Sequence, residues 1–347
     1  MKTIKNIKTV LITAALATFV FAGCEKRSAS SEINSSSPFP EASASYPMTI
    51  THALGTITIP SKPERIATIS WGNHSVPLAL GVVPVGVSMT NYGPADKNGL
   101  LPWVAKGFED LGASNPVVFK DTDGLDFEAI ADTNPDIILA SYSGITQSEY
   151  DTLSKIAPVM AYTKGPYITT WREETIENAR AMGMEEEGKE LVKRTEKLIA
   201  DKLQQYPQIK GKTGAFFWFS VTDLSTYYIY LTKDPRGAYL EDLGLTIPES
   251  VKKLSADGDS FALTISAENS DMLSDVDVII CYGDDTTLAA LQADPLIGKI
   301  PAIKNGAVVV LENASALAAS TTADVLSIPY TIDEYLAKIA AAASLAK

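Results

Sequence analysis

Two stretches that echo each other decide the fold: residues 134–142 read Asn-Pro-Asp-Ile-Ile-Leu-Ala-Ser-Tyr, and residues 274–282 read Ser-Asp-Val-Asp-Val-Ile-Ile-Cys-Tyr. Each contains a continuous apolar run instead of the alternation expected of a half-exposed strand. Continuous runs are typical of strands that helices cover on both faces, as in parallel sheets. The two stretches therefore predict an α/β protein whose strands are mostly parallel.

Further short runs rich in β-branched and aromatic residues predict strands along the rest of the chain. Together with the two stretches above, the predicted strands lie at residues 65–69, 84–88, 117–119, 136–141, 159–162, 215–220, 228–231, 263–266, 276–282 and 307–311. Helical patterns between several of them lie at 75–80, 127–133 and 148–156. The alternation of strand and helix supports the α/β class.

One longer helix is predicted at residues 185–206, where apolar residues recur at helical spacing, no proline occurs and Pro207 follows. At 1.5 Å per residue such a helix is roughly 30 Å long. It divides the predicted strands into two sets, so we expect an N-terminal lobe at 49–184, an inter-lobe helix at 185–206 and a C-terminal lobe at 207–347. The alternative is a long surface helix on a single domain.

The echo between the two halves extends beyond the strands. Glu128 and Glu268 each open a short helix eight or nine residues before the aspartate that leads into the strand. A second echo pairs residues 78–82 with residues 240–245, in the same order, which indicates two related lobes. Ligands of open α/β sheets bind at the carboxyl ends of the strands, so Tyr142 and Tyr282 are expected near a shared cleft. The alternative is that both tyrosines cap the core.

The N-terminus predicts export and lipid anchoring. Lys2, Lys5 and Lys8 precede fourteen largely apolar residues, a run too short to span a bilayer and typical of a signal peptide. The run ends in Val-Phe-Ala-Gly-Cys at 20–24, which resembles a bacterial lipobox, although Phe21 stands where leucine is usual. We expect a signal peptide at 1–23, lipidation of Cys24 and a flexible tether at 24–48 rich in Ser, Ala, Pro and Glu. The alternative is an ordinary signal peptide with an incidental cysteine.

Composition limits the partners. The formal net charge is −13, and removing the three signal-peptide lysines leaves the mature chain at −16. An acidic body argues against nucleic acid and against a broad basic surface on anionic lipid. Beyond Cys24 the chain has one cysteine, Cys281, which lies in an apolar run and is expected to be buried and inert. It also has only two histidines, His52 and His74, too few for a direct metal site.

Several motifs occur in the order found in one known family. They are Ile-Pro-Ser-Lys-Pro-Glu-Arg-Ile-Ala at 59–67, Trp-Gly-Asn-His at 71–74, Leu-Ala-Leu-Gly-Val-Val-Pro-Val-Gly at 78–86, Pro-Trp at 102–103, Asp-Gly-Leu-Asp-Phe-Glu-Ala-Ile at 123–130, Tyr-Ser-Gly at 142–144 and Asp-Pro-Arg-Gly at 234–237. Over residues 49–340 the chain resembles the periplasmic-binding family for siderophore, haem and cobalamin import, and within it the ferric-siderophore branch. Each motif is degenerate alone, but the ordered set is specific.

This resemblance implies two Rossmann-like lobes joined by a single long rigid helix, with a ferric siderophore captured between them. It also implies delivery of the siderophore to an ABC-type importer, no enzymatic activity, no intrinsic cofactor and a monomer on the outer face of the cell membrane. Glu128 and Glu268 match the two glutamates that dock onto basic residues of the permease dimer in this family. The alternative for both is an exposed acid favoured by the helix dipole.

The ligand chemistry predicts aromatic walls with a few cationic or hydrogen-bonding groups, because a siderophore already supplies the oxygen ligands of its iron. Arg236 lies in a turn-like sequence, where its guanidinium can hydrogen-bond the oxygens of the chelate, or alternatively pair with Asp234 or Glu241. The predicted ligand-binding residues are Trp71, His74, Tyr92, Trp103, Tyr142, Trp171, Arg236 and Tyr282.

Two alternatives to a siderophore remain at this stage. Haem or cobalamin capture uses the same fold, and an enzyme or adhesion protein on a similar scaffold is the third class. The sequence leaves open whether the chelate is hydroxamate, catecholate or mixed, and the small number of arginines weakly disfavours an anionic tris-catecholate.

Overall fold

The computed structural model of the chain describes residues 44–113, 115–256 and 260–347. The first lobe contains a five-stranded sheet in the order β5-β4-β3-β6-β7, and all its pairs are parallel. Its strands are β3 (Ile66–Thr68), β4 (Gly86–Ser88), β5 (Val118–Phe119), β6 (Ile137–Ala140) and β7 (Val159–Ala161). All four residues of β6 are buried, as the continuous apolar run predicts.

The strand order of the first lobe creates a switch point between β3 and β6, because the chain builds outward from β3 in one direction and then from β6 in the other. Ligands of open parallel sheets bind at the carboxyl ends of the strands at such a point. The connecting helices are α1 (Ser75–Ala79), α2 (Pro102–Asp110), α3 (Phe127–Asp132) and α4 (Gln147–Leu153). Asp126 caps α3, and Thr146 with Glu149 forms a capping box on α4.

The second lobe contains a mixed five-stranded sheet in the order β10-β9-β8-β11-β12. Its strands are β8 (Gly214–Ser220), β9 (Asp223–Tyr230), β10 (Ala262–Ser266), β11 (Val278–Gly283) and β12 (Val308–Glu312). β8, β11 and β12 are parallel, as predicted, whereas β9 runs antiparallel to both β8 and β10. The physical reason is the short turn at Val221 and Thr222, because so short a connection can join only antiparallel strands.

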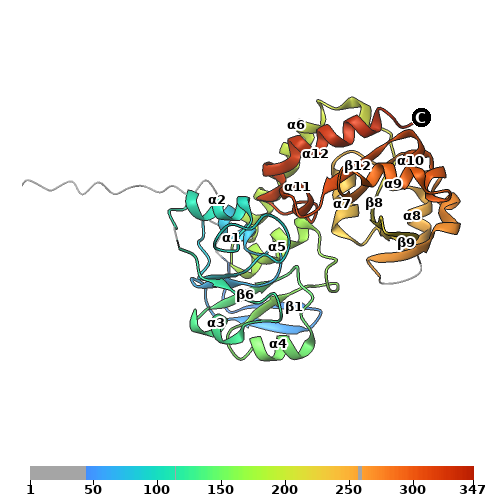
Figure 1. Cartoon of the computed structure of the whole chain (residues 1–347). Coiled ribbons are helices and arrows are strands. Elements are labelled where there is room, and N and C mark those ends of the chain that lie inside the picture. Colours follow the sequence, from blue (N-terminus) through green and yellow to red (C-terminus); the bar gives the residue numbers. More distant parts are fainter. Residues whose placement is uncertain (1–43, 114, 257–259) are drawn as a thin grey trace, which may run out of the picture. The chain divides into compact units, whose positions relative to one another are not determined.

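Helices cover both faces of the second sheet and complete the α/β architecture (Figure 1). They are α7 (Pro235–Asp242), α8 (Glu249–Ser255), α9 (Thr287–Ala293), α10 (Pro301–Asn305) and α11 (Ala316–Ala319), with short 3-10 helices η2 (Ala267–Leu273) and η3 (Ile297–Lys299). In Figure 1 the blue-to-green half of the chain carries β3–β7 and the yellow-to-red half carries β8–β12.

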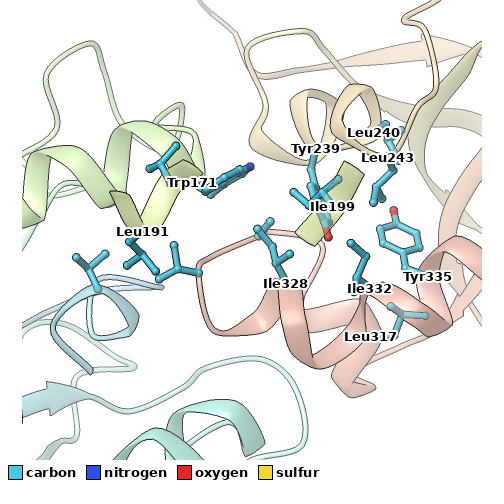
Figure 2. Packing of buried hydrophobic residues seen from close by; sticks show 14 of the residues in the cluster. Trp171, Leu191, Ile199, Tyr239, Leu240, Leu243, Leu317, Ile328, Ile332 and Tyr335 are labelled. Atoms are coloured by element: carbon cyan, nitrogen blue, oxygen red, sulfur yellow. The ribbon is translucent and has the colours of Figure 1, made fainter. Parts of the chain in front are cut away.

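The long helix α6 (Glu185–Leu203) connects the halves and packs against α5 (Trp171–Ala181) and α12 (Ser327–Ala343). Leu191, Val192 and Ile199 lie in one apolar cluster with residues of both lobes, including Ile328 and Ile332 on α12 (Figure 2). The helix ends at Leu203 instead of Tyr206, because the residues before a proline disfavour helical backbone, and η1 (Pro207–Ile209) follows. The domain boundaries on either side of α6 stay predictions.

Two regions show how the structure goes beyond the elements predicted from the sequence. The sequence analysis assigned no helix to the alanine-rich C-terminus, where α12 forms, and it assigned residues up to 48 to a tether. An antiparallel hairpin of β1 (Met48–His52) and β2 (Gly55–Ile59) instead begins at residue 48. Its alternate residues Ile50, Ile57 and Ile59 are buried in the core cluster, so the hairpin belongs to the folded body. Within the described residues, no helix is long and apolar enough to cross a membrane.

Candidate ligand-binding cleft

A cavity of about 240 Å³ opens at the carboxyl edge of the first sheet. Its walls come from the segments that follow each of the five strands, including Trp71 after β3, Thr90 after β4, Asp121 after β5, Gly144 after β6 and Tyr167 after β7. Asp324, which precedes α12, adds a residue from the other half of the chain. The cavity therefore lies where the sheet topology predicts a ligand.

A buried asparagine holds the two loops at the switch point together. The Asn73 side chain, fully buried, donates to the carbonyl oxygens of Ile69 (2.8 Å) and Tyr142 (2.9 Å). Its oxygen accepts from the Tyr142 backbone N–H (3.1 Å) and from Nδ2 of Asn178 on α5 (3.0 Å). These bonds fix the loop that carries Trp71 and His74 against the end of β6.

A second relay crosses three neighbouring strand ends. The backbone N–H of Ser70, after β3, donates to the Ser88 hydroxyl at the end of β4 (2.8 Å), and that hydroxyl donates to Oδ2 of Asp121 after β5. Ser70 has a φ of +63°, a conformation that costs a non-glycine residue free energy and is typical of functional sites. The relay holds the Asp121 carboxylate in the wall of the cavity.

Tyrosines from both lobes gather around Arg236. The guanidinium lies over the Tyr230 ring, 4.0 Å from its centroid, and pairs with the buried Asp234 through Nε–Oδ1 (2.8 Å) and Nη2–Oδ2 (2.7 Å). Burial raises the pKa of Tyr92, Tyr142 and Tyr230, and the positive charge of Arg236 opposes that rise in each case. The three hydroxyls therefore stay protonated, as hydrogen-bond donors beside a fixed cation.

The rim of this tyrosine cluster is tied by direct hydrogen bonds. The Tyr92 hydroxyl donates to Oδ1 of Asn313 (2.8 Å) and accepts from the Ala314 backbone N–H (3.0 Å). The Tyr92 and Tyr282 rings meet edge to face with centroids 6.0 Å apart. Tyr142 meets Tyr167 of the cavity wall in the same way at 5.9 Å, so the tyrosine cluster and the cavity adjoin.

Six of the eight predicted ligand-binding residues fall in these two places. Trp71 and His74 line the cavity, and Tyr92, Tyr142, Tyr282 and Arg236 belong to the tyrosine cluster. The interaction of Arg236 with Asp234, which the sequence analysis left as an alternative, is present. The Arg236 side chain is 17% exposed.

The remaining two, Trp103 and Trp171, lie in the apolar core outside the cavity lining. Trp103 is 3% exposed and forms part of the cluster against which Trp71 and Tyr92 pack. Trp171 is equally buried, and its indole Nε1 donates to Oδ2 of Asp242 on α7 (2.8 Å). In this conformation both residues support the neighbours of the cleft and the contact between α5 and α7. Their assignment as ligand contacts stays a prediction.

His74 is a buried, neutral imidazole in the lining of the cavity. It is 7% exposed, and its Nδ1 has no hydrogen-bond partner among the described residues. Burial lowers its pKa to about 4, so the ring is neutral at physiological pH. No group of three metal-binding side chains occurs in the described part of the chain.

A second, aromatic groove lies on the β8–β9 hairpin. Trp218 and Tyr228 face each other across the β8–β9 hairpin with ring centroids 5.4 Å apart, and both are exposed, at 39% and 44%. With Tyr230 and Phe261 they line a groove of about 420 Å³. Trp218 lies within the run Phe-Phe-Trp-Phe, and the burial pattern along β8 shows that its side chain points outward.

The two predicted docking acids occupy matching positions. Glu128 lies in the first turn of α3 and Glu268 in the first turn of η2, and both are exposed. Neither lines the cavity at the first sheet. Cys24 and the signal peptide lie outside the described residues.

The comparisons with known proteins agree with this geometry. Residues 66–314 match the model of the family described as periplasmic binding protein. A similar solved structure is the crystal structure of PiaA from Streptococcus pneumoniae in complex with ferrichrome. The two chains are 52% identical, with a TM-score of 0.83, and the match covers 86% of this chain and 99% of that one. It is 27% identical to the probable siderophore-binding lipoprotein YfiY of Bacillus subtilis, over 79% of this chain and 78% of that protein.

A further relative is the ferric enterobactin-binding periplasmic protein FepB of Escherichia coli, 24% identical over 76% of this chain and 83% of that protein. The family match covers more than half of the sequence, and the chain therefore belongs to the periplasmic binding protein family. Its members bind substrates for transport and are not enzymes, which confirms the predicted class of protein. The match to solved structures of the family confirms the two-lobed α/β fold.

Proposed function

We propose that this protein captures a ferric siderophore of the tris-hydroxamate type between its two lobes and delivers it to an ABC importer. The observation that carries the proposal is the cluster of Arg236 with tyrosines of both lobes, which adjoins the cavity at the first sheet. A guanidinium cation and protonated phenols can donate hydrogen bonds to the negatively charged oxygens of a wrapped iron complex. The aromatic rings supply apolar walls for the organic shell.

The hydroxamate class is supported by two observations. The relative that is 52% identical was crystallised with ferrichrome, a tris-hydroxamate, whereas the relative named for enterobactin, a tris-catecholate, is 24% identical. In addition, the one arginine of the tyrosine cluster is already balanced by Asp234, so little net positive charge is available for a highly anionic chelate.

A titration of the purified protein with ferrichrome, followed by quenching of tryptophan fluorescence, tests the proposal. We expect saturable quenching for the unaltered protein and binding at least tenfold weaker for Arg236→Gln, since a charge-assisted hydrogen bond is worth about 1.5–3 kcal/mol. Arg180→Gln is the matched control, because Arg180 lies on α5 with a half-exposed side chain. Circular dichroism verifies that each variant is folded. Absence of quenching by any ferric hydroxamate would refute the proposal.

Haem is the alternative ligand that the same titration separates. An axial tyrosine or histidine bound to haem iron shifts the Soret band of the porphyrin, whereas a ferric hydroxamate has no porphyrin and no such band. His74 is the described histidine beside the cavity, and His74→Ala therefore removes the candidate axial ligand. We expect no Soret shift when haem is added to either form.

Delivery is proposed to rest on Glu128 and Glu268. Two separated carboxylates that meet basic pockets on a permease dimer set the orientation and the rate of encounter. Replacing both with alanine should abolish siderophore uptake by cells and leave ferrichrome affinity unchanged in the purified protein. Alanine at the exposed acids Glu109 and Glu334 serves as the control pair. Uptake at the original rate in the Glu128/Glu268 variant would refute the docking role.

Anchoring is proposed to occur through a lipid on Cys24 at the outer face of the cell membrane, with the protein acting as a monomer. The lipobox-like sequence before Cys24 and the names of the lipoprotein relatives support this. Cys24→Ser should move the protein from the membrane fraction to the medium or periplasm. Retention of the variant in the membrane fraction would contradict lipid anchoring.

A further inference from the structure

The charge of the cavity at the first sheet differs from that of the tyrosine cluster beside it. The described residues that line the cavity include three carboxylates, Asp121, Glu149 and Asp324, and neither lysine nor arginine. Lys120 precedes Asp121 in the chain but is exposed outside the lining. A cavity walled by one sign of charge raises the local concentration of ligands of the opposite sign.

The three carboxylates are not equivalent. Oε2 of Glu149 belongs to the capping box of α4, where it accepts hydrogen bonds from the Thr146 backbone N–H (2.7 Å) and hydroxyl (2.8 Å). Oδ1 of Asp324 accepts from the backbone N–H groups of Leu326 and Ser327, both at 2.8 Å, and burial raises the pKa of this carboxyl. Burial raises the pKa of Asp121 as well, but Asp121 is only partly buried and is held in the wall by the Ser70–Ser88 relay.

The relay gives Asp121 a defined orientation without neutralising it. The Ser88 hydroxyl is a neutral donor, and the acid nearest in electrostatic effect, Asp126, is occupied as the N-cap of α3, where it accepts from Ala129 N (3.0 Å). No lysine or arginine makes an ion pair with Asp121 among the described residues. The donors to this carboxylate, the Ser88 hydroxyl and the backbone N–H groups of Met89 and Asp121, are all neutral, so no cation offsets its negative charge.

His74 is a second polar side chain in the lining of this cavity. Its ring is more than nine-tenths buried, it lines the cavity, and Nδ1 has no partner among the described residues. A buried polar atom without a partner costs free energy that a ligand group can recover. Because burial keeps the ring neutral, His74 contributes hydrogen bonding and no positive charge to the cavity.

From this geometry we infer that Asp121 is a specificity-determining residue that selects the charge of the ferric complex, favouring hydroxamates with a cationic arm and disfavouring anionic chelates. The inference rests on the proposed function and deepens it. Three hydroxamates, each with one negative charge, neutralise ferric iron, so the charge of the whole complex is set by its side arms. Three catecholates, each with two negative charges, leave the complex anionic. A carboxylate in the wall therefore separates the two chemistries by Coulomb energy.

Ferrioxamine B and its N-acetylated derivative form the matched ligand pair, because acetylation removes the terminal ammonium charge and keeps the iron-binding groups. We expect the unaltered protein to bind ferrioxamine B about fivefold to tenfold more tightly than the acetylated form, a range typical of a partly buried ion pair. Asp121→Asn should reduce this ratio to near one, and Asp121→Glu should restore most of it. The ratio should also shrink as salt is added.

Asp123→Asn is the control variant, since it removes the same charge from the same loop at an exposed position outside the cavity lining. Its ratio should equal that of the unaltered protein. Ferrichrome, which is neutral, reports whether each variant still folds and binds. If ferrichrome binds normally and Asp121→Asn keeps the original ratio, the role of Asp121 is overturned while the proposed function stands. The role of Asp121 is also overturned if the unaltered protein binds ferrichrome but binds ferrioxamine B and its N-acetylated form equally tightly. If no ferric hydroxamate binds the unaltered protein, both proposals fall.

Discussion

Replacing Asn73 with alanine tests how the site is built. The side chain is fully buried and makes five hydrogen bonds of 2.8–3.2 Å, to Ile69 O, Trp71 O, Tyr142 O, Tyr142 N and Asn178 Nδ2. Alanine removes all five. It leaves three carbonyl oxygens, one backbone N–H and one amide without these partners, and only a water that enters the space left by the side chain could replace them.

The magnitude follows from the cost of an unsatisfied buried group, about 1–3 kcal/mol each, summed with less than full additivity. We therefore expect Asn73→Ala to lower the free energy of unfolding by about 3–5 kcal/mol. Because total stabilities are about 5–15 kcal/mol, this is a large fraction of the whole. With an m-value of about 3 kcal/mol/M, the urea midpoint falls by roughly 1–1.7 M.

Urea unfolding followed by far-ultraviolet circular dichroism measures this change. Asn269→Ala is the matched control, because Asn269 is exposed on η2. This variant should change the free energy of unfolding by no more than about 0.5 kcal/mol. A loss below about 1 kcal/mol in Asn73→Ala would show that the loops after β3 and β6 are held by other contacts, and the account of the switch point would be wrong.

Three further measurements follow from the structure. Burial raises the pKa of the Cys281 thiol to about 12, so this thiol should resist labelling by a thiol reagent in the native protein and react fully in denaturant. Mass spectrometry of the peptide that contains Cys281 measures the labelling, and rapid labelling of the native protein would contradict the burial of this residue. Burial raises the pKa of Glu177 to about 7, above its unfolded value of about 4.3; the folded state then binds the proton more tightly, and stability falls as pH rises from about 4.5 to 7. Glu177→Gln should therefore gain about 1–2 kcal/mol relative to the unaltered protein between pH 5 and pH 8, and identical pH profiles would exclude the effect. Asp242→Ala removes the partner of Trp171 and Arg172 and should lower the free energy of unfolding in urea by about 2–4 kcal/mol. The control Asp201→Ala breaks the exposed pair with Lys197 and should lower it by less than about 0.5 kcal/mol. Equal losses in the two variants would show that Asp242 does not bridge α5 and α7.

Much of the fold was predictable because buried parallel strands have a strong local signal. The runs at 136–141 and 276–282 become β6 and β11, and the other predicted strands also form. The antiparallel course of β9 was not predicted, although the short connection after Ser220 dictates it. The helix α12 was missed because its alanine-rich sequence gives a weak apolar stripe, and its burial depends on packing against α6.

The site was harder to predict because burial depends on tertiary packing. Trp71 follows a strand and lines the cavity, and Tyr142 follows a strand and packs against Tyr167 of the cavity wall. Trp103 and Trp171 instead start helices and turn into the core. The side chain of Asn73 shows its importance only once the loop after β3 meets the end of β6. The exposed pair of Trp218 and Tyr228 depends on the register of a hairpin, which a run of aromatic residues does not reveal.

The position of bound iron tests the central claim most directly. Crystals grown with ferrichrome and measured at the iron absorption edge locate the metal by its anomalous signal. We predict one strong peak between the cavity walled by Trp71 and Asp121 and the tyrosine cluster around Arg236. A peak elsewhere on the protein, with these side chains facing empty solvent, would contradict the account.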